Sequence, residues 1–199
     1  MSNSHLNTNF SILNTKNKMN KIYFTSDHHF GHKSIIKFCN RPFKDVKEMN
    51  NVLIRKWNEK IGINDDVYHL GDFGLIHKED LSNILDRLNG NIHLIAGNHE
   101  NAAIQNKEKF VWIKNYFELK VKDPDCGSRL IILFHYAMRV WRHDFKESWH
   151  LYGHTHGTLP DKNHKLAFDV SVDAHDFYPL SYEDVKVIMS KKNWKPPFD

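Results

Sequence analysis

Ile22-Tyr23-Phe24-Thr25-Ser26-Asp27-His28-His29-Phe30-Gly31-His32 is the most informative stretch of this chain. Its first four residues are β-branched or aromatic, which is typical of a strand buried on both faces. The aspartate and the histidines follow directly, so they are expected at the carboxyl end of that strand. Ligands bind at this end of the strands in open α/β sheets. The stretch therefore predicts an α/β fold with a ligand site at the end of its first strand.

The same arrangement returns further along the chain. Apolar strands are predicted over residues 67–70, 92–95 and 130–134. Each ends on a polar cluster, and the clusters are Gly71-Asp72, Gly97-Asn98-His99-Glu100 and His135. Polar residues at the ends of several strands are too coordinated for a purely structural explanation, so we expect them to form one site.

Helices are predicted where apolar residues recur at helical spacing. The first begins at the N-cap Asp45, carries Val46, Met49, Leu53 and Trp57, and ends at Gly62. Others are expected over residues 79–88, 102–110 and 182–189, the last capped by Ser181. A hairpin of residues 117–121 and 130–134 and a strand over 166–173 complete the pattern. This order predicts a single α/β domain over residues 21–199, preceded by a disordered leader over residues 1–20.

The composition is typical of a soluble globular protein with one core, because the 199 residues are 40% hydrophobic and 26% charged. No run approaches the roughly eighteen apolar residues that span a bilayer, so no membrane partner is expected. The two cysteines, Cys39 and Cys126, indicate no disulfide framework, and a cytoplasmic location follows. The formal charge of +4 falls to +2 without Lys16 and Lys18, which is no nucleic-acid-binding surplus.

Gly153-His154-Thr155-His156-Gly157 is a fifth polar cluster. In an extended segment, side chains two residues apart point to the same side, so His154 and His156 are expected to reach one metal ion or two adjacent ones. By itself this motif is equally compatible with a surface turn, because the chain contains 15 histidines. Together the five clusters offer oxygen and nitrogen ligands without a thiolate, which favours catalytic Mn²⁺, Fe or Zn²⁺ over a structural zinc site.

The ordered set Asp-x-His, Gly-Asp, Gly-Asn-His-Glu, His and Gly-His-x-His resembles the calcineurin-like metallophosphoesterases, in particular small bacterial and phage members. It spans residues 27–156. The resemblance implies two mixed β-sheets packed as a sandwich flanked by helices, the αββα fold of that family. It also implies two divalent ions, most simply Mn²⁺, with Fe, Zn²⁺ or Ni²⁺ as alternatives. One ion would be held by Asp27, His29 and His156, the other by Asn98, His135 and His154, with Asp72 bridging and His99 as the catalytic histidine.

The chemistry of these residue types agrees with that resemblance. Two cations lower the pKa of a shared water enough to give hydroxide near neutral pH, and they neutralise the phosphate during in-line attack. His99, beside a ligand but itself free, is placed to protonate the leaving alkoxide. We therefore expect a phosphoesterase for small mono- or diesters, with nucleotides among the candidate substrates.

Substrate contacts are less strongly indicated. His32 resembles a residue lining the site in small members of the family, and Arg41 and Arg139 are candidates for a phosphate fork, or equally for surface ion pairs. His28, His69 and Asp173 are each compatible with a structural role or with orienting a neighbour. The aromatic residues Trp112, Trp141, Trp149 and Tyr152 suit the core better than base stacking.

Two other functions are compatible with the sequence. One is a nuclease for single-stranded DNA or RNA, which an open site favours and the small charge surplus does not. The other is a non-catalytic binding module, which an intact set of seven metal-binding side chains argues against. The physiological substrate, the native metal pair and the oligomeric state are left open.

Overall fold

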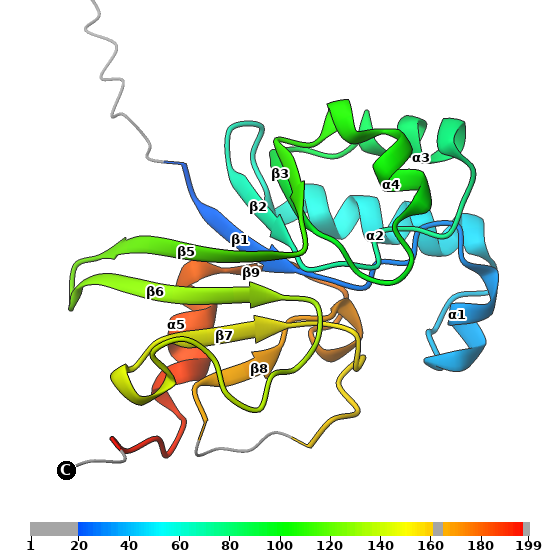
Figure 1. Ribbon diagram of the computed structural model, residues 1–199. Coiled ribbons are helices and arrows are strands. Elements are labelled where there is room, and N and C mark those ends of the chain that lie inside the picture. The colour runs from blue at the N-terminus through cyan, green and yellow to red at the C-terminus, as the bar shows by residue number, and fades with distance from the viewer. Residues whose placement is uncertain (1–19, 161–164, 197–199) are drawn as a thin grey trace, which may run out of the picture.

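The computed structural model describes residues 20–160 and 165–196. Its two β-sheets lie face to face, with helices on the outer side of the first sheet (Figure 1). The leader predicted over residues 1–20 lies outside the described residues except for Asn20. In the described part of the chain, no helix is long and apolar enough to cross a membrane.

The first sheet is mixed, with the strand order β4-β3-β2-β1-β9. Its parallel strands are β1 (Ile22–Thr25), β2 (Asp66–His69), β3 (Asn91–Ile95) and β4 (Trp112–Lys114), and β9 (Leu180–Ser181) pairs antiparallel with β1. Because β1, β2 and β3 are parallel neighbours, the loops that leave their carboxyl ends lie side by side.

The second sheet is also mixed, with the order β5-β6-β7-β8. A predicted hairpin forms β5 (Tyr116–Asp123) and β6 (Gly127–Phe134), and β7 (Trp149–Tyr152) and β8 (Ala167–Asp169) extend it in parallel. The strand expected over 166–173 ends early, since Val172–Ala174 forms a 3₁₀ turn. Two mixed sheets with flanking helices confirm the predicted fold class.

Helices on the first sheet bury one of its faces. The helices are α1 (Lys33–Phe38), α2 (Val46–Lys60), α3 (Lys78–Leu85) and α4 (Asn101–Gln105). α2 begins at the predicted cap, where the Asp45 side chain accepts from the Glu48 N–H, and its Trp57 is fully buried against the sheet. The predicted helix over 102–110 is shorter, because a 3₁₀ turn (Lys107–Lys109) follows α4.

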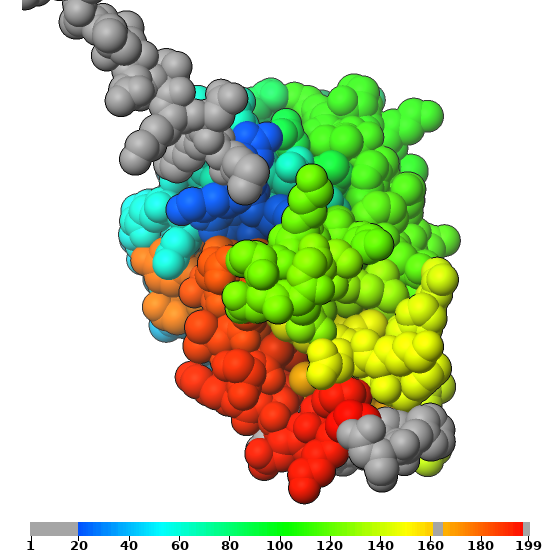
Figure 2. Space-filling model, turned by 90° about the vertical axis from the view of Figure 1, so that its left-hand side faces the viewer, coloured from blue at the N-terminus to red at the C-terminus, as the bar shows by residue number. Residues whose placement is uncertain are grey.

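The interior between the sheets is a second core. Phe24 and Leu70 from the first sheet meet Leu133 and Leu151 from the second. α5 (Tyr182–Ser190) packs into the same core and begins at the predicted cap, Ser181, which forms a capping box with Asp184. In Figure 2 the first half of the chain, blue to green, lies above the yellow to red second half. Sheet packing therefore brings the strand ends of both halves to one edge.

Candidate metal centre

Backbone hydrogen bonds hold together the loops that leave the strands. The Asp27 N–H donates to the Gly71 carbonyl at 2.9 Å, which joins the loop after β1 to the loop after β2. The Gly153 N–H donates to the His135 carbonyl at 2.9 Å, which joins the loops after β6 and β7. The His154 N–H donates to Asp27 Oδ2, also at 2.9 Å, and so connects the two sheets. Four of the five predicted clusters therefore meet in space.

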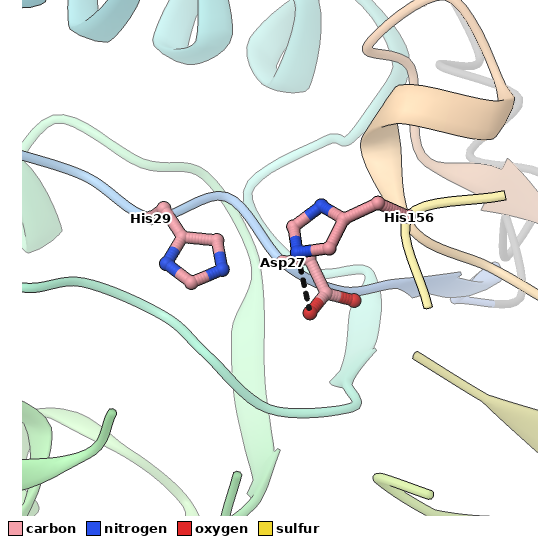
Figure 3. Close-up of side chains that lie close together, drawn as sticks. All are labelled: Asp27, His29 and His156. Atoms are coloured by element: carbon pink, nitrogen blue, oxygen red, sulfur yellow. Dashed lines mark ion pairs between the residues drawn. The ribbon is translucent and has the colours of Figure 1, made fainter. Parts of the chain in front are cut away.

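Asp27, His29 and His156 form the first group of potential ligands, with ligand atoms all within 4.8 Å of one another. Figure 3 shows the three side chains pointing toward a common space, His156 arriving from a different loop. His156 Nε2 lies 3.9 Å from Asp27 Oδ1. The other ring nitrogen, Nδ1, donates to an Asp173 oxygen at 2.6 Å, so the Nε2 lone pair faces Asp27.

Asp72, His135 and His154 form the second group, within the same 4.8 Å limit. His135 Nδ1 lies 2.7 Å from the Leu70 carbonyl, which only accepts, so this nitrogen carries the proton. His135 Nε2 therefore presents a lone pair, 3.3 Å from Asn98 Oδ1 and 3.7 Å from Asp72 Oδ1. Three electron-rich atoms that face one another suit a cation between them.

Asp72 lies between the two groups. Its Oδ2 is 3.5 Å from His29 Nε2, in the first group, while its Oδ1 faces His135 in the second. His29 Nε2 is buried and has no hydrogen-bond partner, as expected for an atom aimed at a ligand. The geometry thus gives one carboxylate oxygen to each group.

The backbone at these residues is strained. Five of the residues in the two groups have a positive φ, namely Asp27 at 59°, His29 at 52°, Asp72 at 56°, His154 at 68° and His156 at 48°. Such conformations cost on the order of 1 kcal/mol or more each and cluster at functional sites. The sequence suggested an extended segment around His154 and His156. The structure differs, because β7 ends at Tyr152 and both histidines have a positive φ. Their side chains diverge to different groups instead of sharing one side.

Two glycines leave room for this crowding. A Cβ at Gly97 would collide with the Asp72 carboxylate, and a Cβ at Gly153 would collide with the carboxylate of Asp27. The glycines before Asn98 and before His154 therefore let one loop pack directly against a ligand on another loop.

Electrostatics also favour a bound cation. Burial raises the pKa of Asp27 to about 8, although the nearby charge of His156 acts in the opposite direction. Burial lowers the pKa of His29 to about 2 and also lowers that of His135, so both rings are neutral near pH 7 and can ligate. A buried carboxylate is poorly solvated, and a divalent cation held between it and the neutral His29 ring would stabilise its negative charge. The residues present therefore fit a pair of metal ions.

A buried ion pair supports the first group. Arg41 binds both oxygens of Asp173 at 2.8 Å through Nε and Nη2, and it also donates to the carbonyls of Asp27 and His28. Its side chain is fully buried. With these donors engaged inside the protein, Arg41 is not placed to bind a substrate phosphate. Asp173 orients His156, a role that the sequence left open. The two residues are 17 positions apart, so the sequence contained no local signal of this contact.

Asp173 and His156 also lie near Cys39, in a third group of possible ligands. Burial raises the pKa of the Cys39 thiol to about 11, so the thiolate that would bind a metal is disfavoured. Asp173 is already paired with Arg41. The first and second groups are therefore better candidates.

The other predicted site residues differ in how close they lie to the metal centre. His32 and His99 are half-buried at its edge, with ring centroids 5.3 and 5.5 Å from that of His29. Arg139 is exposed on the loop after β6. Sequence reasoning missed Tyr136, which is 39% exposed and whose ring lies 4.7 Å from that of His154. Tyr136 directly follows the proposed ligand His135 in the sequence, and this adjacency could have identified it as a site residue.

His28 faces away from the centre. Its Nδ1 lies 2.9 Å from His69 Nε2, and its ring packs against Phe30 and Trp57. Burial holds the pKa of both His28 and His69 well below the usual range. The two histidines thus form a neutral, buried pair beneath the site.

Comparison with known proteins identifies relatives of this arrangement. Over 180 residues the chain is 32% identical to the uncharacterized protein MJ1445 of Methanocaldococcus jannaschii, a match that covers 87% of this chain and 93% of that protein. The chain belongs to the MJ1445 family. The gene 66 protein of Mycobacterium phage L5 is 29% identical over 186 residues, covering 78% of this chain and 88% of that protein. No family model matches the sequence.

A solved structure supports the fold. The protein of unknown function AQ665 from Aquifex aeolicus superposes with a TM-score of 0.63 at 24% identity, covering 85% of this chain and 99% of that one. At this identity the likeness establishes the fold alone. The function of the MJ1445 family must therefore be argued from the site.

Proposed function

We propose that this protein is a dinuclear metal-dependent phosphoesterase that hydrolyses small phosphate mono- or diesters. One observation carries the proposal: two groups of lone-pair donors lie side by side, and Asp72 presents one oxygen to each. Cations held there would lower the pKa of a water molecule and neutralise phosphate oxygens. The resemblance of the five motifs to calcineurin-like metallophosphoesterases supports the same reading.

The residues of this chain have distinct parts in the proposed reaction. Asp27, His29 and His156 would hold one ion, Asn98, His135 and His154 the other, and Asp72 both. His99 is held in place by its own N–H, which donates to Asp72 Oδ1 at 2.9 Å, and its ring lies at the accessible edge of the centre. From there the imidazole would give a proton to the leaving oxygen of the ester.

Chelation and substitution test the proposal. Protein loaded with Mn²⁺ should hydrolyse bis-p-nitrophenyl phosphate, and both chelator and Asp72→Asn should abolish this activity. The matched control is Asp176→Asn, because Asp176 is also an aspartate at a positive φ but is exposed. This variant should retain the activity. Activity that survives both chelator and Asp72→Asn would refute the mechanism.

The general-acid role has its own test. His99→Asn should slow alkyl esters far more than p-nitrophenyl esters, because p-nitrophenolate leaves without a proton. An equal loss for both substrates would remove His99 from that role.

A nuclease on single-stranded nucleic acid is the second candidate. The exposed Tyr136 beside His154 favours it, because aromatic side chains stack on unpaired bases. Cleavage of single-stranded DNA or RNA at rates well above those for small diesters would favour this candidate.

A further inference from the structure

A pocket opens on the outer face of the second sheet, between chain segments that also carry proposed metal ligands. Its volume is about 510 Å³, within the range of small-molecule sites. Ile132, Tyr152 and Ala167 belong to a small apolar cluster with Trp141, separate from the two main cores. The loop that joins β6 to β7 covers this face (Figure 1). On the first sheet, helices cover the corresponding outer face. The pocket is therefore not a gap in either main core.

The residues that line the pocket lie close in the chain to the proposed metal ligands. Its lining starts at Ala137, two residues after His135, and includes Tyr152, two residues before His154. Leu159, on a third wall, is three residues after His156. Two residues of extended chain span at most about 7 Å. At the level of the backbone, the pocket lining therefore starts within about 7 Å of His135 and of His154.

The loop between ligand and pocket is fixed in place. The Met138 N–H donates to His150 Nε2 at 3.1 Å, and His150 Nδ1 lies 3.1 Å from the Ile132 carbonyl. Trp141 donates to the carbonyl of Ser148 at 3.2 Å. The floor of the pocket is thus preformed, which lowers the entropic cost of binding a ligand.

The chemistry of the lining is aromatic and basic. Trp141 and Tyr152 lie at the floor, Leu159 and Pro160 are apolar walls, and none of the lining residues that the structure describes is acidic. Lys165 also lines the pocket, but it pairs with Asp144 at 3.1 Å. Arg139 is exposed and has no hydrogen bond or ion pair with the described residues. A flat ring with acceptor atoms on its edge matches this combination, because its faces suit the apolar walls and its edge suits the guanidinium.

We infer that this pocket binds the nucleoside arm of a phosphodiester substrate, with the base against the apolar walls and an acceptor edge toward Arg139. The inference rests on the proposed phosphoesterase function and narrows it to nucleoside-bearing diesters. Tyr136 lies between the proposed ligands and the pocket in the chain, at the position where the sugar would pass.

Three diesters with the same leaving group test the inference. Thymidine 5′-(p-nitrophenyl phosphate), hexyl p-nitrophenyl phosphate and methyl p-nitrophenyl phosphate differ only in the retained arm. With Mn²⁺-loaded protein, kcat/KM for the thymidine ester should exceed that for the methyl ester by at least about tenfold. The hexyl ester should gain much less, because it lacks the ring and its acceptors.

Two exposed positions allow the pocket to be altered without touching the core. Leu159→Trp, which fills the pocket, and Arg139→Ala should each lower the thymidine-to-methyl ratio of kcat/KM by roughly five- to tenfold. Arg142→Ala is the control, since Arg142 lies three residues further along, outside the lining, and pairs with Glu118. It should leave the ratio unchanged. Melting temperatures would confirm that all three variants fold.

The outcomes separate the two proposals. Hydrolysis of all three esters at similar kcat/KM, an equal gain for the hexyl ester, or a ratio that both pocket variants leave unchanged would overturn the nucleoside inference alone. Failure of the metal-loaded protein to hydrolyse any of the esters would overturn the proposed function, and this inference with it.

Discussion

His156 Nδ1 donates to Asp173 Oδ2 at 2.6 Å, across 17 residues of chain. Burial tends to lower the pKa of His156, but the hydrogen bond and the charges of Asp173 and Asp27 outweigh it and raise that pKa. Asp173 is held in turn by Arg41, which also binds the Asp27 carbonyl. One buried ion pair therefore positions the side chain of His156 and the backbone of Asp27, both in the first ligand group.

Asp173→Asn should weaken metal binding at the first group by about 10- to 100-fold, because the ring of His156 loses the carboxylate that orients it. Calorimetric titration with Mn²⁺ would measure the change, with the melting temperature as a second readout, since Arg41 would be left buried without its partner. Asp176→Asn serves as control. Unchanged affinity at both metal sites would show that the contact does not position the ligand.

His154→Ala and His156→Ala should each remove a different ion, because the two side chains belong to different groups. Metal content per protein, measured after equilibration with limiting Mn²⁺, should fall from about two toward about one in each variant. Anomalous scattering from crystals of the two variants would locate the remaining ion. Loss of the same ion in both variants would contradict the assignment.

Gly153→Ala should disrupt the centre, since the added Cβ would collide with the Asp27 carboxylate and lie 2.5 Å from Ser26 Oγ. We expect a loss of about 1 to 3 kcal/mol in the free energy of unfolding, together with weaker metal binding. Gly127→Ala is an informative comparison, because its Cβ meets nothing within 4 Å and only its φ of +76° is strained. Weakened metal binding in Gly127→Ala, or none in Gly153→Ala, would count against the steric explanation.

Asp123 should make the protein less stable in acid. Hydrogen bonds from Tyr182, from the Asp125 N–H and from Lys186 hold the pKa of Asp123 at about 2, below its ordinary value. Its contribution is therefore complete above about pH 4 and is lost as the pH falls toward 2. Asp123→Asn should cost about 1 to 2 kcal/mol in urea unfolding at pH 6 and little at pH 2. A cost independent of pH would exclude this linkage.

The sequence by itself determined strands β1, β2 and β3, the β5–β6 hairpin, and the residue types that follow these strands, whereas the short strands β4, β7 and β9 were not predicted. The run from Ile22 to Thr25 is apolar enough to form a buried strand in any α/β sheet, and Asp27 and His29 follow at its end whatever the neighbours are. Helix α2 likewise depends on local signals, an Asp45 cap and an apolar stripe that ends in Trp57. These features depend on spacing along the chain, which the sequence contains directly.

The resemblance to a known family implied how the side chains are grouped, but only the tertiary structure supplies the physical reason for that grouping. His154 and His156 are two residues apart, yet left-handed backbone conformations direct them to different groups. Arg41 is buried on Asp173, 132 residues away, and so is not free for substrate. Contacts over such separations follow from which sheet faces which, and local propensity carries no information about that packing. The pocket on the outer face of the second sheet has the same origin, because its walls come together only when β6, β7 and β8 pair.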